Sequence, residues 1–473
     1  MKTSEEIMKA KSVHIFAWPF HFKLEKKGLL KHEVKQEIKQ KGWRKKSLDF
    51  ANLEADEGKN RDASDCFMLY QYLSQAARDI FIFSDICTIY EYPFEDGKKY
   101  EYYIKRDDKE YILPIASIEL HVYEYGVGIL FFQVWNEKYS VEDIKQINDY
   151  GRRVSLPYLA KEKLLCADIL GILIDGVAIQ KTDFQDIAIK CMDKKLKDPG
   201  TALKQAGFLE DLLNCNLNHS GKNSIQVISH TDDRMFVCTL IRDTQLSAMI
   251  AGGMKKEELL YSILFIDPDD ATCQNADMRK KLLEDAVYER WSDLGTVYGV
   301  TAYSLCCITT DAEFINESVI RPFIVEYSYL VSLVLAQRIG IISFTARTGK
   351  VIARFNNKRN RKRHGIGYFQ AVRLSQIQKQ YIDFKNRLLI LEASTQDQGI
   401  EIYQLLQKQM LVKNEQDILD GKLQSLYEAA NISIGNRLSV IGILLAFAAL
   451  FPGVGNKILE KVYEIYTCFQ LMR

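Results

Sequence analysis

The sequence predicts an α+β protein: one or more N-terminal cytosolic α/β domains, then long helices, then a C-terminal hydrophobic helical hairpin. Three observations predict this class. Apolar and polar residues alternate within 117–136, which is the period of a half-buried strand. After about residue 316 the pattern becomes helical, with apolar residues three and four positions apart. Residues 438–456 then carry no charge over 19 positions, between Arg437 and Lys457.

Composition narrows the class of protein. With 473 residues the chain is long enough for two or three domains. Lys+Arg number 63 and Asp+Glu 62, so no overall charge attracts nucleic acid, and we expect no nucleic-acid partner. The ten cysteines form no C-x-x-C pair and the first residues contain no signal-peptide core, so we expect most of the chain in a reducing cytoplasm.

Motifs of catalysis are not found in the sequence. It contains no H-E-x-x-H, no G-x-S-x-G and neither common phosphate-binding loop. We therefore do not expect an enzyme, and no cofactor is identified from the residues themselves.

The first region, 1–160, is predicted to be an α+β domain. Residues 12–23 are rich in β-branched and aromatic side chains, and Pro19 among them favours an edge or irregular strand. Gly126 and Gly128 mark a turn or bulge between two strands within 117–136.

A short helix is predicted directly after these strands, at 140–153. Ser140 is suited to its N-cap, with Glu142 and Asp143 in the first turn, where negative charge is favourable. The further regions are a second α+β region at 161–315, a helical stalk at 316–436 and the hydrophobic membrane segment at 437–473.

The stalk begins with a second apolar stretch, 323–344. Its longest charge-free part is 11 residues and Arg338 interrupts it, so we expect a buried cytosolic helix there. A narrow coiled-coil-like seam follows, formed by Ile377, Tyr381, Phe384, Leu388 and Leu391. That seam needs a partner, and both an intramolecular hairpin and a second subunit are open.

The uncharged run 438–456 is predicted to cross a membrane. As a helix it is about 28 Å long, against a hydrocarbon core of roughly 30 Å. The alternative is a buried helix that turns at 452–456 within a soluble bundle. Residues 458–472 are amphipathic, and Glu460 and Glu464 share one face, so this piece either lies in the membrane interface or lines a cation path.

This layout, and the phrase at 394–447, resemble the CorA-like magnesium channel superfamily. The phrases at 147–159, 232–237 and 290–304 are also similar to those of uncharacterised bacterial CorA-like membrane proteins. The resemblance implies a homo-oligomer, a pentamer in that family, in the cell membrane with most of the chain cytoplasmic. It also implies membrane lipid as a partner and a divalent cation, magnesium, as the ion.

The family's Gly-Met-Asn motif is missing. The nearest text is Gly453, Val454, Gly455 and Asn456, so the resemblance carries over only Gly453, Gly455 and Asn456 as loop residues. CorA-like proteins also occur as membrane effectors in antiviral (phage) defence, with a cytosolic domain that senses a ligand. We expect such a domain here to receive a small-molecule or nucleotide signal.

Two charged groups are further candidates. A basic patch, suited to anionic lipid or a nucleotide, consists of Arg354, Lys358, Arg359, Arg361, Lys362 and Arg363. Nucleic acid suits it less well, because none of these residues is aromatic and able to stack on bases. Hard carboxylate ligands for a divalent metal are offered by Asp232, Asp233, Asp267, Asp269 and Asp270. A solvated loop, and turn or helix-capping roles, are the simpler explanations.

The predicted function is an oligomeric ligand-gated cation channel or membrane effector with a cytosolic sensing domain. The alternative is a soluble or peripheral interaction protein whose C-terminal hairpin packs in its own helical core.

Overall fold

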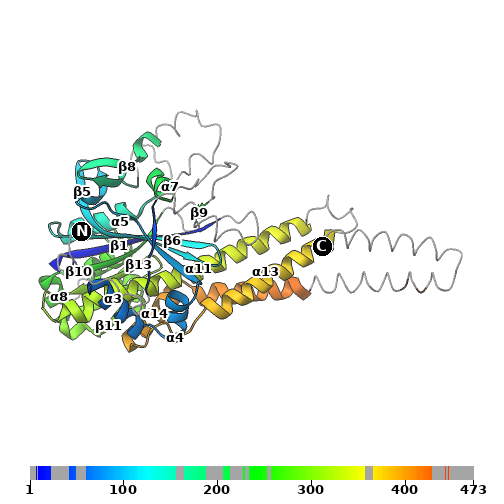
Figure 1. Cartoon of the computed structure of the whole chain (residues 1–473). Coiled ribbons are helices and arrows are strands. Elements are labelled where there is room, and N and C mark those ends of the chain that lie inside the picture. Colours follow the sequence, from blue (N-terminus) through cyan, green and yellow to red (C-terminus); the bar gives the residue numbers. More distant parts are fainter. Residues whose placement is uncertain are drawn as a thin grey trace. The chain divides into compact units, whose positions relative to one another are not determined.

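One large mixed β-sheet organises the N-terminal part of the chain (Figure 1). The computed structural model describes residues 7, 9–22, 42–48, 60–155, 165–187, 206–213, 227–229, 234–252, 257–356, 366–428, 443 and 446. Thirteen strands join in the order β11-β12-β13-β10-β1-β6-β5-β4-β7-β8, with β2, β3 and β9 attached at its side. Strands from 1–160 and from 161–315 pair within this sheet.

The strands are β1 (Ser12–Phe22), β2 (Arg44–Lys45), β3 (Cys87–Glu91), β4 (Tyr100–Arg106), β5 (Lys109–Tyr123), β6 (Val127–Asn136), β7 (Ile169–Ile174), β8 (Val177–Asp183), β9 (Val227–Ser229), β10 (Phe236–Arg242), β11 (Val287–Trp291), β12 (Thr296–Val300) and β13 (Ser304–Thr309). The helices are α3 (Asn60–Tyr72), α4 (Gln75–Arg78), η2 (Asp79–Phe83), α5 (Val141–Arg152), α7 (Gly207–Leu213), α8 (Thr244–Ala251), α9 (Glu257–Phe265), α10 (Ala276–Ala286), η4 (Ser292–Leu294), η5 (Asn316–Ile320), α11 (Arg321–Asn356), α13 (Ile366–Leu388) and α14 (Asp397–Gln409). A further helix covers residues 412–428.

Pro19 predicted an edge or an irregular strand; β1 lies in the middle of the sheet, so the prediction of an edge strand was wrong, but its pairing is irregular beside Pro19. Strand β1 pairs with β6 along one side. Along its other side it pairs with β10 over Ser12–Ala17 and with β9 over Phe20–Phe22. Pro19 falls in the gap between these two partners, where a missing N–H breaks no ladder on that side.

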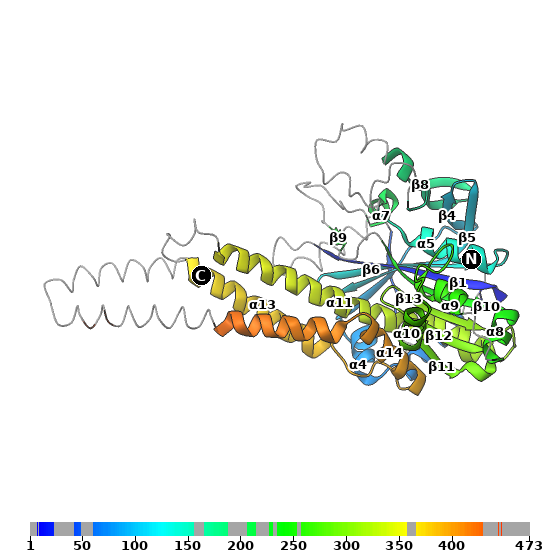
Figure 2. The ribbon, with the colours of Figure 1, turned by 180° about the vertical axis from the view of Figure 1, so that it is seen from behind.

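Helices cover both faces of the sheet (Figures 1 and 2). On one face Phe16, Phe132 and Ile118 join a buried cluster with Ile147 of α5. On the other face Ser332 of α11 meets residues of β5. Because both faces are buried, the strands are not half-exposed as the alternation in 117–136 suggests.

The predicted hairpin and the helix after it are confirmed. Strands β5 and β6 are antiparallel, and Gly126 takes the positive φ of +81° in the turn between them. Ser140 caps α5: its hydroxyl accepts a hydrogen bond from the Asp143 amide, and the Ser140 amide donates one to the Asp143 carboxylate, which forms a capping box.

The chain divides into two units. The first consists of 1–342 and 384–413, and the second of 343–383 and 414–473. The sheet lies in the N-terminal part and long helices follow it, so the α+β class is confirmed in this coarse form.

The apolar stretch 323–344 lies within α11. By length and composition the helical stretch Asn316–Ala353 could cross a membrane, but 78% of its most apolar window is buried inside the protein. The seam that follows is covered within the chain at Ile377, Tyr381, Phe384 and Leu388. Leu391 was wrongly included, because α13 ends at Leu388 and Leu391 is 86% exposed.

Candidate functional site

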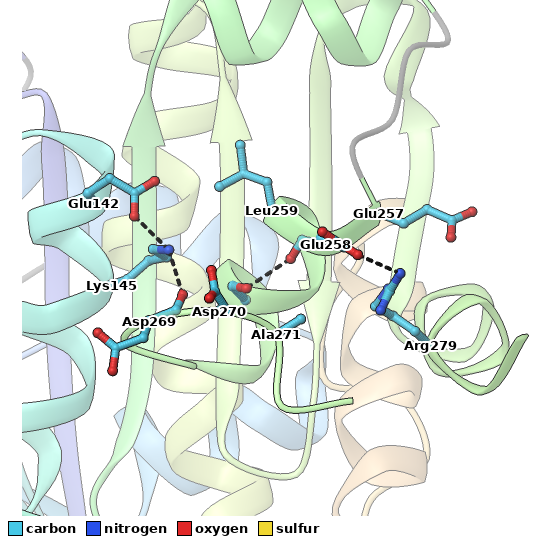
Figure 3. Close-up of a pocket in the computed structure, with 10 residues that line it drawn as sticks. Glu142, Lys145, Glu257, Glu258, Leu259, Asp269, Asp270, Ala271 and Arg279 are labelled. Carbon is cyan, nitrogen blue, oxygen red and sulfur yellow. Dashed lines mark hydrogen bonds and ion pairs between the residues drawn. The ribbon is translucent and has the colours of Figure 1, made fainter. Parts of the chain in front are cut away.

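A charged hollow of about 550 Å³ lies in the first unit, among α5, α9, α10 and the loop between the last two (Figure 3). Its charged lining consists of five carboxylates and two cations: Glu142, Glu257, Glu258, Asp269, Asp270, Lys145 and Arg279. Because carboxylates outnumber cations, the hollow attracts positively charged groups and repels phosphate. It is therefore unsuited to a nucleotide signal.

Helix α5 supplies one wall and holds the loop. Lys145 places its ammonium group 2.6 Å from Glu142, one turn earlier, and donates a hydrogen bond to the Asp269 carbonyl at 2.9 Å. Gln146 donates to the Pro268 carbonyl at 2.7 Å and to the Asp269 carboxylate at 3.1 Å. These contacts fix the loop main chain against α5.

The loop itself begins with a strained residue and an acidic turn. Ile266 has a φ of +59°, which is unfavourable for a β-branched side chain. The buried carboxylate of Asp267 accepts hydrogen bonds from the Thr272 amide at 2.7 Å and from the Thr272 hydroxyl at 2.8 Å. Asp267 therefore shapes the turn.

Helix α10 closes the hollow through Arg279. Its guanidinium donates to the Cys273 carbonyl at 2.8 Å and to the Glu258 carboxylate at 3.1 Å. Its Nε is buried and has no hydrogen-bond partner within the described part of the chain. The side chain of Arg279 is 9% exposed, so it joins the loop to α9 from within the wall.

The described part of the hollow offers binding more readily than catalysis. The Ser262 hydroxyl donates a hydrogen bond to the Glu258 carbonyl at 2.9 Å, so its proton is already engaged within α9. Within the residues that the structure describes, no group of three His, Cys, Asp or Glu side chains could hold a metal ion. An amine or guanidinium group is the chemistry that these walls accept best.

The acidic candidates from the sequence separate here. Asp269 and Asp270 line the hollow, whereas Asp267 is used in the turn. Asp232 and Asp233 lie outside the described residues. The magnesium expected from the resemblance therefore has no ligand set among the described side chains.

The other candidates fall almost wholly outside the described residues. Arg354 belongs to α11, although its side chain is not described. The rest of the basic patch (Lys358, Arg359, Arg361, Lys362 and Arg363) and the loop and pore candidates (Gly453, Gly455, Asn456, Glu460 and Glu464) lie outside the described ranges.

A buried Ser–His–Glu array on the other face of the sheet was missed from the sequence. The Ser332 hydroxyl lies 2.8 Å from His121 Nδ1, and His121 Nε2 lies 3.3 Å from the Glu119 carboxylate. The Tyr123 hydroxyl also lies 2.7 Å from Ser332. Lys46 completes the array with an ion pair to Glu119 at 2.9 Å.

The electrostatics of this array keep each group in one state. Burial alone would raise the pKa of Glu119, but the Lys46 ammonium and the His121 ring lower it to about 2. Burial lowers the pKa of His121, against the opposing effect of Glu119, so its ring is neutral near pH 7.

Burial also decides the role of the array. Ser332 is 0% exposed and His121 is 2% exposed, so no substrate reaches the hydroxyl in this conformation. The array satisfies polar groups where α11 meets β5. The one signal for this array in the sequence is the alternation of Glu119 and His121 with apolar residues. That pattern does not reveal that α11 covers the face of the sheet on which they lie.

Comparisons with known proteins found no relative of this chain. No protein-family model, no curated protein and no solved structure matches the chain.

Proposed function

We propose that the protein is a C-terminally membrane-anchored, CorA-like effector whose α/β unit receives a signal and passes it through helices to the membrane. In this proposal the protein is a homo-oligomer in the cell membrane with most of the chain in the cytoplasm. It passes cations, or disturbs the membrane, when the α/β unit responds. Magnesium selectivity is left out because the Gly-Met-Asn motif is missing.

The observation that carries the proposal is the way in which the two units are joined. The divisions at 342/343 and 383/384 fall inside α11 (Arg321–Asn356) and α13 (Ile366–Leu388). The third, at 413/414, falls in the first turn of the helix at 412–428. A continuous helix carries a rotation or shift along its axis, whereas a flexible linker absorbs it.

Polar contacts fix α11 to the first unit at defined points. Besides Ser332, the buried Gln337 donates hydrogen bonds to the Leu388 carbonyl and to the Tyr403 hydroxyl, each at 2.8 Å. Gln407 in turn donates to Gln337 at 3.0 Å. Such directional bonds resist sliding of α11 more than apolar packing alone, so a movement in α13 or α14 is transferred to α11.

The membrane part of the proposal is supported by the run 438–456, which belongs to the second unit. Ile443 and Ala446, the described residues of that run, are helical, and Ile443 is 63% exposed. An apolar helix with an exposed isoleucine gains free energy when lipid or another apolar surface covers it.

One observation favours the alternative, a soluble or peripheral interaction protein. Helix α11 is also long and apolar, yet most of its apolar window is buried by the protein itself. This chain therefore packs at least one such helix without lipid, and its C-terminal segment could pack in the same way in a helical core.

Substitution in the middle of the run separates the two functions. The Ala446→Arg variant places a charge at mid-membrane depth, at a cost of roughly 2.5–3.5 kcal/mol on the insertion scale. We expect it to lose membrane residence in a flotation assay, while the Ala446→Leu control keeps it. Equal flotation of both variants, or none for the natural chain, contradicts the proposal.

A further inference from the structure

Glu326 is a buried carboxyl group in α11 whose side chain has one hydrogen-bond partner, Ser394, among the residues that the structure describes. It is 2% exposed, and it faces the connection between α13 and α14. Among the residues that the structure describes, no Lys, Arg or His forms an ion pair with it. A buried carboxylate without a cation is costly, so the group needs another explanation.

The partner is Ser394, in the 389–396 connection. The Ser394 hydroxyl lies 2.6 Å from Glu326 Oε1 and 3.1 Å from the carbonyl oxygen of Tyr72, the last residue of α3. The Gln396 amide donates to the same hydroxyl oxygen at 3.1 Å. A hydroxyl has one proton to donate, but here it faces two acceptors.

Proton count resolves this conflict. If Glu326 is protonated, its O–H donates to Ser394, and Ser394 donates to Tyr72, so both O–H groups have an acceptor. If Glu326 is ionised, Ser394 turns to the carboxylate; the Tyr72 carbonyl keeps its hydrogen bonds from the Thr395 amide and hydroxyl, so the cost falls on the carboxylate. The carboxylate then has one donor where ionised carboxylates usually have several.

The main chain of α14 packs closely against the carboxyl group at Gly399. A Cβ built on Gly399, in the first turn of α14, would lie 2.8 Å from Glu326 Oε1 and 2.3 Å from the Ser394 hydroxyl. The main chain of α14 is thus pressed against the carboxyl group. The same connection is tied to α3 through the Leu73–Ser394 bridge and through the Thr395 amide, which donates to Tyr72 at 2.7 Å.

We propose that Glu326 and Ser394 form a proton-operated latch that holds the 389–396 connection against α11 while the carboxyl group is protonated. Ionisation weakens the latch, and the connection opens more often. The latch is a property of the first unit and does not depend on the membrane proposal. If that proposal is correct, the latch makes the output sensitive to cytoplasmic pH.

The neighbouring charged groups leave Glu326 as the titrating one. On α11, Tyr327 accepts a hydrogen bond from Gln398 at 2.6 Å, and burial raises its pKa well above 10, so it stays neutral. On α14, Asp397 is exposed and faces Arg290 at 3.6 Å. The amino end of α14 adds a partial positive charge, which is less than a counterion.

Burial sets the pH range of the latch. It raises the pKa of Glu326 from 4.5 to about 7, and the Ser394 hydrogen bond lowers it only in part. If the opened connection restores the ordinary pKa, the closed form holds more protons between these values. The opening equilibrium constant then rises about tenfold from pH 6 to pH 8 and levels off above that.

Hydrogen–deuterium exchange on the full chain tests the latch. Exchange in peptides that cover 393–400 is measured from pH 6 to pH 9 and divided by the rate of an unstructured peptide at the same pH. We expect protection to fall about tenfold by pH 8 in the natural chain and to stay constant in Glu326→Gln, which is always neutral. The Glu392→Gln variant removes an exposed carboxylate from the same 389–396 connection; it is the matched control and should behave like the natural chain.

A second variant keeps the test decisive if Glu326→Gln folds poorly. Ser394→Ala removes the hydrogen bond that lowers the pKa, so its transition should move to higher pH than that of the natural chain. The latch is overturned if protection in the natural chain is independent of pH, if Glu326→Gln shows the same transition, or if Ser394→Ala leaves the midpoint unchanged.

Discussion

The close approach of α11 and α13 at Gly340 gives the most specific stability prediction. Gly340 is buried in α11, and a Cβ at this position would lie 2.4 Å from Cε2 and 2.6 Å from Cζ of Phe384. Phe384 is itself fully buried and packs edge-on against Tyr125 with ring centroids 5.2 Å apart. The ring would have to move by about 1 Å to restore ordinary contact, and packed cores resist such shifts.

Two effects of Gly340→Ala compete, and we expect packing to win. Alanine is favoured over glycine inside a helix by about 1 kcal/mol. Overpacking of a filled core costs about 1–3 kcal/mol. The net expectation is a loss of about 1 kcal/mol in the free energy of unfolding, measured by urea denaturation of the full chain.

The sign should reverse when the ring is removed. In the Phe384→Leu background, which by itself costs about 1–2 kcal/mol, the added methyl group fits. There Gly340→Ala should stabilise the protein by up to about 1 kcal/mol. Gly349→Ala is the matched control, because Gly349 lies in the same helix with nothing within 4 Å of its would-be Cβ. The reasoning is refuted if Gly340→Ala stabilises the protein in both backgrounds, as Gly349→Ala should.

Three further predictions follow from the same structure. Burial lowers the pKa of His14 to about 4, so between pH 6.5 and 4 the unfolded chain binds more protons than the folded chain. Lowering the pH through this range should therefore reduce the free energy of unfolding by about 3 kcal/mol, and His14→Gln should not show this loss. Urea titrations at each pH measure it, and parallel pH profiles of the two proteins would exclude it. Ser332→Ala should lower the free energy of unfolding by about 1–3 kcal/mol, because His121 and Tyr123 lose their shared hydrogen-bond partner. Ser328→Ala, which loses a bond to the Val325 carbonyl, should change it by less than about 0.5 kcal/mol. Equal effects of the two variants would contradict the role of the array. Finally, if Glu460 and Glu464 line a cation path, Glu460→Gln with Glu464→Gln should reduce cation flux into liposomes, and unchanged flux excludes that path.

The sequence predicted local structure well where the signals are local. The alternation in 117–136 and the glycine at 126 were sufficient to place the second half of β5, β6 and their turn, but not the first half of β5, which begins at Lys109. Ser140 and Asp143 were sufficient to place the start of α5. Each of these signals lies within a few residues of the structure that it specifies.

The failures came from contacts between distant parts of the chain. Pro19 favoured an edge or irregular strand. The sequence does not reveal that two different partners, β10 and β9, meet beside Pro19, so the place of β1 inside the sheet was missed. Leu391 continues the spacing of the seam, but the chain leaves the helix at Leu388.

The site residues show the same limit. Asp269 and Asp270 were recognised from the sequence as an acidic group, but the two cations that complete the hollow were not. Lys145 lies over a hundred residues before them, and Arg279 lies on the helix that follows them. Glu326 and Ser394 attracted no notice because neither belongs to a motif, and burial alone gives Glu326 its unusual pKa. Such groups are recognised only when the fold brings them together.

Helices α11 and α13 run from the first unit into the second, and we propose that the second unit's run 438–456 resides in the membrane. An alkaline-carbonate wash of membranes from cells that express the full chain, beside a chain that stops after residue 436, tests it most directly. We predict that the full chain stays in the membrane pellet and that the shortened chain is released. Release of both chains would contradict the claim and identify 438–456 as a helix of the protein's own core.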